Sequence, residues 1–135
     1  MMEICALLSE TDCTFQVRGF GAHWPVDVRY DLSTVMEQLP DLISAIRNGS
    51  VGHLDFYGQG LERVLDFSPV DRRTIITCVS GTDFEPPLER ENLDTESLVA
   101  MLVDTATRFA HAASQVAPSI TMTEPIGTWI RENRE

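Results

Sequence analysis

Apolar and polar residues alternate with a period of two over several short segments, which is the pattern of a β-strand with one buried and one exposed face. Thr11-Asp12 predicts a turn between the first two segments, and Pro69-Val70-Asp71 predicts a turn between the last two. We therefore expect six strands, which cover residues 3–8, 13–18, 26–31, 52–57, 61–67 and 74–80.

After the third of these strands, apolar residues repeat with the period of a helix. Thr34 and Glu37 have the spacing of a capping box, although Ser33 competes as the cap. Pro40 predicts a kink or a split in this helix, and Asn48-Gly49 predicts its end. The apolar positions of this helix are Val35, Leu39, Leu42, Ile43 and Ile46.

A second helix is predicted after a long loop that covers residues 81–94. Asp94 has the position of an N-cap, and Leu93 and Leu98 are spaced as a hydrophobic staple around it. Pro118 predicts the end of this helix, and residues 124–131 predict a short additional one. The residues expected to be buried are Leu98, Leu102, Ala106, Phe109 and Ala113 in the second helix, and Ile126, Trp129 and Ile130 in the short one.

The order of elements is thus β-β-β-α-β-β-β-α. Strands joined by hairpins form a mainly antiparallel sheet, and helices outside the hairpins cover one of its faces. We expect an α+β fold with about six strands and two main helices on one face. The 135 residues are predicted to form a single domain, 1–135, and the apolar fraction of 43% is enough for its core.

The charge of the chain narrows the choice of partner. There are 21 acidic residues and 10 basic ones, all of them arginine, and the net charge is −11. A protein that binds nucleic acid or an anionic membrane needs a basic surface, so neither partner is expected. The charge favours a basic protein partner through electrostatic steering. The alternative is that the acidic surface only keeps the protein in solution.

The three cysteines, Cys5, Cys13 and Cys78, have no metal-binding spacing, and their odd number fits a reducing compartment. The first residues lack the basic start and the long apolar run of a signal peptide. No apolar segment reaches the length of a membrane span. These features predict a cytoplasmic protein.

The segment GHLDFYGQGLERVLDF, residues 52–67, raises the question of a phosphate-binding loop. A dinucleotide site needs a third glycine where Arg63 stands, and it needs a helix where the alternation predicts a strand. Gly58-Gln59-Gly60 is therefore interpreted as a hairpin turn. Leu54 and Phe56 would face the core. The residues expected on the other face are His53, Asp55, Tyr57, Glu62 and Asp66.

No set of residues in the chain has the spacing of a catalytic or metal-binding motif. His53 and Asp55 share a strand face but provide too few ligands for a metal, and no nucleophile motif accompanies them. We predict a protein that is not an enzyme and that needs neither a cofactor nor a metal. One alternative is a small ligand-binding or enzymatic domain that would use His53, Asp55 and Tyr57 in a cleft between sheet and helices. Another is an oligomer-forming accessory protein whose exposed strand edge or Trp24 patch pairs with itself.

The most acidic segment is the predicted loop, GTDFEPPLERENLDTES. Its apolar residues stand among acids, and Pro86-Pro87 stiffens the backbone, which lowers the entropy lost on binding. It is either a binding loop or a solvated connector whose acids favour the helix N-terminus. Trp24 is a second candidate contact, because tryptophan is enriched at binding hot spots, but it suits the core as well.

The hairpin that follows a helix, together with small size and acidity, resembles the immunity proteins of bacterial polymorphic toxin systems, those of contact-dependent or type VI secretion. The hairpin pattern L-x-F-Y-x-Q-G is also similar to that of short uncharacterised proteins of GC-rich bacteria. The residues of this pattern are Leu54, Phe56, Tyr57, Gln59 and Gly60. The resemblance implies a non-enzymatic cytosolic inhibitor that covers the active site of a basic toxin. The residues predicted to contact it are Trp24, Asp55, Tyr57, Glu62, Asp83, Phe84, Glu85, Glu89 and Glu91.

Overall fold

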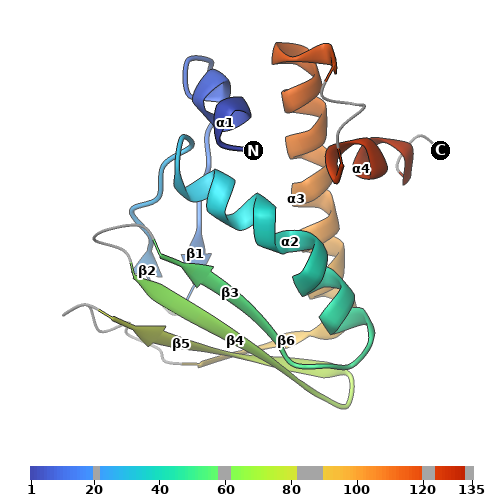
Figure 1. The fold of residues 1–135 in the computed structure, drawn as a ribbon. Coiled ribbons are helices and arrows are strands. Elements are labelled where there is room, and N and C mark those ends of the chain that lie inside the picture. The colour runs from blue at the N-terminus through green and yellow to red at the C-terminus, as the bar shows by residue number, and fades with distance from the viewer. Residues whose placement is uncertain (20–21, 58–61, 82–89, 120–123, 133–135) are drawn as a thin grey trace.

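The computed structural model describes residues 1–19, 22–57, 62–81, 90–119 and 124–132 of the chain. These residues form an α+β fold in which an antiparallel sheet of four strands lies against a layer of helices (Figure 1). The fold class is therefore as predicted, but the number of strands and their order along the chain are not. No helix among the described residues is long and apolar enough to cross a membrane.

The sheet has the order β3-β4-β5-β6, and every neighbouring pair is antiparallel. Three of its strands match predicted ones, namely β3 (Gly52–Phe56), β4 (Arg63–Val70) and β5 (Arg73–Ser80). The β4–β5 turn lies at Asp71-Arg72, later than predicted, and Asp71 has a positive φ of 57°. The fourth strand, β6 (Arg90–Asp94), falls in the segment predicted as a loop. Its sequence is mostly polar, so it has no apolar alternation to reveal it.

The first 31 residues differ most from the prediction. Residues 3–8, expected to be a strand, belong to α1 (Met2–Leu8), which buries Ile4, Cys5 and Leu8 at helical spacing. A short apolar run does not by itself distinguish a buried strand from a helix. Residues 13–17 have no regular structure, and β1 (Arg18–Gly19) pairs with β2 (Ala22–His23) in a separate small sheet. The expected sheet of six strands is therefore replaced by one of four and one of two.

Residues 26–31 form the entry to a helix and not the predicted third strand. The Asp27 carboxylate accepts hydrogen bonds from the backbone N–H groups of Tyr30, at 2.7 Å, and Asp31, at 3.1 Å. The Asp31 carboxylate accepts one in return from the Asp27 N–H, at 2.9 Å. This reciprocal pair satisfies donors that a helix start leaves open. The first long helix therefore begins at Asp31, before the predicted capping box at Thr34.

The helix α2 (Asp31–Arg47) buries all five of its predicted apolar positions. Thr34 lies inside it, and its hydroxyl donates to the Tyr30 carbonyl at 3.1 Å, so it does not form the predicted cap. Pro40 lies inside α2 and does not split it into two helices. Its end is as predicted, since Asn48 is the C-cap and Gly49 follows with a φ of 69°.

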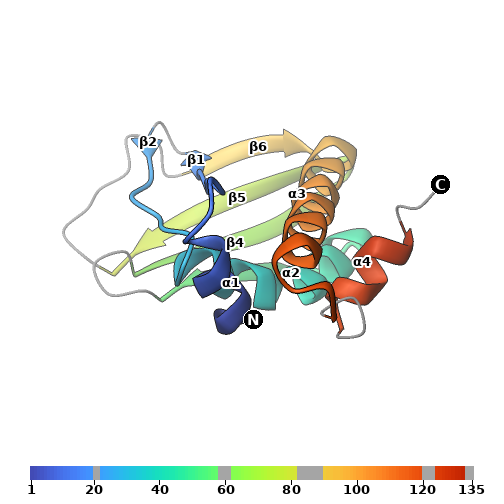
Figure 2. The same cartoon turned by 90° about the horizontal axis from the view of Figure 1, so that it is seen from above.

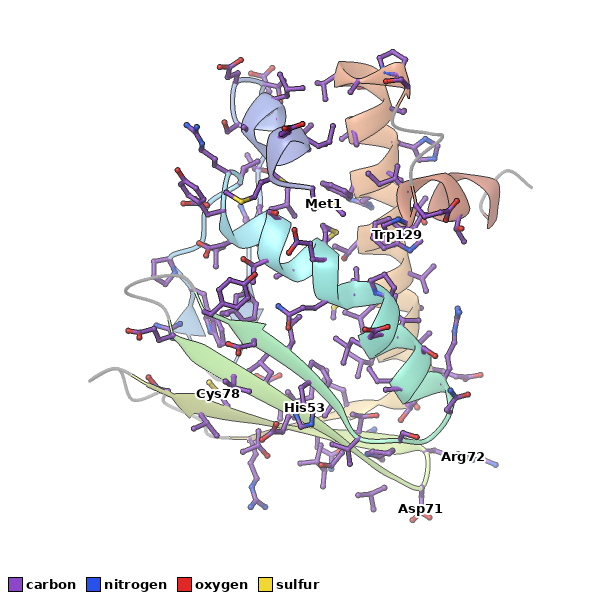
Figure 3. The ribbon with its side chains drawn as sticks, viewed as in Figure 1. Met1, His53, Asp71, Arg72, Cys78 and Trp129 are labelled. Carbon is purple, nitrogen blue, oxygen red and sulfur yellow. The ribbon has the colours of Figure 1, made fainter. Side chains whose placement is uncertain are left out.

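The helix α3 (Thr95–Val116) begins as predicted, because the Asp94 carboxylate accepts the Ser97 N–H at 3.0 Å. All five residues of its predicted stripe are buried. The short α4 (Ile126–Glu132) docks Ile126 and Trp129, both buried, as expected, whereas the side chain of Ile130 lies outside the described part of the structure. Trp129 packs edge to face against Phe109 of α3, with ring centroids 6.3 Å apart, and Figure 3 shows it between these helices.

The helices lie on one face of the sheet, as predicted. Figure 1 shows α2 and α3 above the strands, and Figure 2 shows that α3 begins beside the end of β6. α2 packs on β3, and α3 contacts α2, β5 and β6. The core between the layers includes Leu54, Phe56, Leu65, Phe67, Ile76 and Cys78 from the sheet. No described helix or strand covers the opposite face, which we call the open face.

Candidate functional site: the open face of the sheet

The register of the strands decides which side chains reach the open face. Successive side chains in a strand point to opposite sides, and burial alternates accordingly along β3, β4 and β5. The open face therefore carries the residues that alternate with the core. They are His53 and Asp55 from β3, Val64, Asp66 and Ser68 from β4, Ile75, Thr77 and Val79 from β5, and Arg90 and Asn92 from β6.

His53 and Asp66 form a cross-strand pair on this face. They lie directly opposite each other, and Nδ1 of His53 is 2.6 Å from Oδ1 of Asp66. Their side chains are 63% and 40% exposed, so water surrounds the pair. His53 shares the strand face with Asp55, as predicted, but its partner is Asp66. Among the described residues no group of three potential ligands could hold a metal ion.

Apolar side chains adjoin these acids. Val64 of β4 lies opposite Val79 of β5 and also opposite Asp55 of β3. Val79 is 54% exposed, and Tyr57, which follows β3, is 60% exposed. We call Asp55, Tyr57, Val64, Asp66 and Val79 the open-face patch. It combines two carboxylates with accessible apolar surface, which is a composition suited to contact with a protein.

Trp24 and Arg63 lie on the opposite side of the same strands. Arg63 shares its strand face with Leu65 and Phe67, and it is buried. Its guanidinium lies 4.5 Å from the ring centroid of Trp24, in a cation–π contact. The Trp24 ring also packs edge to face on Phe56, with centroids 5.1 Å apart. Burial lowers the pKa of Arg63.

This arrangement gives Trp24 a packing role. Its exposed fraction is 3%, so the described structure does not present it as a surface contact, and it is not part of the open-face patch. The burial of Arg63 was not predicted from the sequence. The alternation of β4 could have indicated it, because Arg63 has the same strand face as Leu65 and Phe67, and that face is otherwise apolar.

A glutamine closes the outer edge of β3. The Gln38 side chain of α2 donates from Nε2 to the Asp55 carbonyl at 2.8 Å and accepts the Asp55 N–H at Oε1, at 2.7 Å. The primary amide thus imitates a neighbouring strand at this position. It satisfies two backbone groups that would otherwise face solvent, and it ties the start of the open-face patch to the helix layer.

Of the remaining predicted contact residues, Glu62 lies near this region, Glu91 lies on the helix-facing side of the sheet, and the others lie outside the described residues. Glu62 is exposed before β4, and its carbonyl accepts the Gly81 N–H at 2.7 Å. Glu91 is half-buried in β6, opposite Ile76. Asp83, Phe84, Glu85 and Glu89 of the acidic segment lie outside the described residues, as do Gly58, Gln59 and Gly60 of the predicted turn.

The hollows of the surface do not bring together the residues of the predicted cleft. One of about 390 Å³ lies between α2 and β3 and includes His53 beside Glu37 and Asp41, but neither Asp55 nor Tyr57 lines it. Another, also of about 390 Å³, lies between α2, α3 and α4, with Ile43, Val103 and Trp129 in its walls. Neither of these two hollows is lined by His53, Asp55 and Tyr57 together.

None of the three cysteines forms a disulfide bond, and Cys5 and Cys78 are buried. Burial raises the pKa of the Cys5 thiol to about 11 and also raises that of Cys78. At neutral pH these groups are thiols, whereas the thiolate is the nucleophilic form. Cys5 and Cys78 therefore act as small apolar core residues.

Comparisons with known protein families, with curated proteins and with solved structures find no match to this chain.

Proposed function

We propose that this protein is a non-enzymatic binding module of the immunity type, which neutralises a cognate bacterial toxin by covering its active site. The observation that carries the proposal is the open-face patch, where Asp55 and Asp66 flank the exposed Val79 and Tyr57 on a sheet face that no described element covers. The toxin would present a basic surface, because the chain carries a net charge of −11 and complementary charge guides encounter.

The two kinds of residue in the patch have different roles in this proposal. The carboxylates attract the partner and select against acidic surfaces, which affects mainly the association rate. The apolar residues lose their contact with water in the complex and slow its dissociation. The rigid sheet holds both sets in place before binding, which lowers the entropy lost on association. Glu62 would extend the same negative surface. The acidic segment 83–89, which lies outside the described residues, remains a predicted contact by its composition alone.

The test uses one substitution on the patch and a matched control on the helix layer. Val79 and Met101 are both 54% exposed, but Val79 lies on the open face and Met101 on α3. We expect Val79→Glu to weaken binding of the toxin encoded next to this protein by at least about tenfold, because it buries a charge in the interface. Met101→Glu should leave binding within about twofold. Isothermal titration calorimetry measures both.

Charge provides a second arm of the same experiment. Asp55→Asn with Asp66→Asn should slow association and flatten its salt dependence, whereas Asp104→Asn on α3 should do neither. The absence of a complex at micromolar concentration would reject the proposed function. A complex that tolerates Val79→Glu as well as Met101→Glu would place the contact elsewhere on the molecule.

A further inference from the structure

The two edges of the sheet differ in how their backbone groups are satisfied. In an antiparallel ladder the N–H and C=O groups of successive residues point alternately to one neighbour and to the other. The Gln38 side chain bonds both the N–H and the C=O of Asp55, so these two backbone groups point away from β4. The backbone groups of the preceding residue, Leu54, therefore point towards β4, and Leu54 and Leu65 form a hydrogen-bonded pair. The alternation then continues across the sheet, because the described pairings show no bulge.

Following this alternation to β6 identifies the residues at its free edge. Ile76 and Thr74 of β5 bond to Glu91 and Leu93, so Arg90, Asn92 and Asp94 direct their backbone groups away from the sheet. The bond from the Thr95 N–H to the Arg72 carbonyl, at 2.9 Å, continues the same alternation and supports this assignment. Figure 2 shows β6 as the outer strand, with no described helix or strand along its free side.

We propose that β6 is an interface at which a second copy of this chain adds its own β6, so that the two sheets become one. The two strands would run antiparallel about a twofold axis at Asn92. The Asn92 N–H of each copy would then bond to the Asn92 carbonyl of the other, and the Asp94 N–H to the Arg90 carbonyl. Such symmetric use of one surface by both copies is typical of homodimers.

The side chains of β6 complement each other in this register. On the open face Arg90 of one copy stands opposite Asp94 of the other, and the symmetry axis repeats the pair. Opposite charges at directly paired positions stabilise a sheet. Both hydrogen bonds from Ser97 end on Oδ2 of Asp94, so Oδ1 can accept from the guanidinium. This local complementarity opposes the repulsion between two chains that each carry a net charge of −11.

Arg73 holds the central residue of the interface in place. It donates from Nε to Oδ1 of Asn92 at 2.7 Å and from Nη2 to the Asn92 carbonyl at 3.0 Å. A carbonyl oxygen has two lone pairs, so this one can accept a second hydrogen bond from the other copy. The Asn92 side chain is thereby fixed before the copies meet. Since β6 has five residues, the contact is small and the dimer is expected to be weak and concentration-dependent.

The test is sedimentation equilibrium of the whole chain from about 10 µM to about 1 mM, near physiological ionic strength. We expect a monomer at the low end and a dimer with a dissociation constant on the order of 100 µM. Asn92→Pro removes an N–H that has no role in the monomer's own ladder, and it should weaken the dimer by more than about tenfold. Asn92→Ala keeps the backbone N–H but loses the side-chain bond to Arg73, so it should weaken the dimer far less than Asn92→Pro does, by about twofold to threefold.

A charge substitution with a matched control identifies the register. Arg90→Glu places a carboxylate opposite Asp94 and should weaken association about tenfold. Arg72→Glu at the tip of the β4–β5 hairpin (Figure 3) changes the net charge equally and should have little effect. A chain that stays monomeric at about 1 mM, or a dimer that both Asn92→Pro and Arg90→Glu leave unchanged, would overturn the proposal. Circular dichroism of each variant checks that the monomer is folded.

Discussion

The two faces of the sheet use the same three strands for different purposes. Leu54, Phe56 and Phe67 point into the helix layer and are almost fully buried. Their sequence neighbours His53, Asp55 and Asp66 point away from it, and His53 and Asp66 pair in contact with water. The inner face provides the free energy of folding, because it removes apolar surface from water. The residues of the open face are therefore not constrained by packing against the helix layer.

The largest effect should come from removing a large, fully buried side chain of the inner face. Phe56 is 1% exposed, and Phe56→Ala would lower the free energy of unfolding by about 3–5 kcal/mol, since it leaves a cavity that the sheet and helices cannot fill. Chemical denaturation measures this loss. The adjacent Tyr57 is 60% exposed, and Tyr57→Ala should change stability by less than about 0.5 kcal/mol. Equal losses for both would contradict the division between faces.

An intermediate effect is expected at the connection between the helix layer and the strand edge. Gln38→Ala leaves the N–H and C=O of Asp55 without the side-chain amide that satisfies them, and it should lower the free energy of unfolding by about 1–2 kcal/mol. Hydrogen exchange should become faster at the Asp55 amide. The neighbouring Glu37 is exposed, so Glu37→Ala serves as the control and should leave that amide protected.

The smallest effect on stability is expected at Asp31, an acidic residue that is buried at the start of α2. Burial raises its pKa, and the nearby charge of Asp27 also raises it, although a backbone hydrogen bond acts in the opposite direction. A raised folded-state pKa means that the native state favours the protonated carboxyl. The contribution of this group to stability is therefore present below its unfolded pKa and is lost as the pH rises through its folded pKa.

Asp31→Asn tests this directly, because asparagine keeps a carbonyl oxygen that can accept the Asp27 N–H at every pH. We expect the variant to have a slightly higher melting temperature than the parent at pH 7. The difference should shrink as the pH falls below the unfolded pKa, where the parent carboxyl is protonated as well. A difference that grows towards acid pH would show that the carboxylate form stabilises the fold.

Arg63 is an informative exception to the comparison between faces. It is a charged residue at an inward-facing position, and it is accommodated because the Trp24 ring lies over its guanidinium. Trp24 is far from Arg63 in sequence, so no local pattern links them. The open-face patch likewise contains residues from three separate segments of the chain, and the pairing of His53 with Asp66 follows from the register of β3 on β4.

Prediction from sequence succeeded where the buried residues repeat with a clear period. The strands β3, β4 and β5 and the helices α2 and α3 were all identified, since each has a long apolar stripe or a regular alternation. It failed at α1, where the apolar run is too short to show its period, and at residues 26–31, where Asp27 and Asp31 form a helix start. It also missed β6, whose residues are mostly polar.

The sequence by itself determined the α+β class and which residues of β3 and β4 face the core, because strand and helix periods are local properties of the chain. Only the tertiary structure decided that Trp24 lies on Arg63, that Gln38 closes the edge at Asp55, and that β6 extends the sheet. These contacts join residues distant in sequence. Their formation depends on how the layers pack, and a local pattern carries no information about that packing.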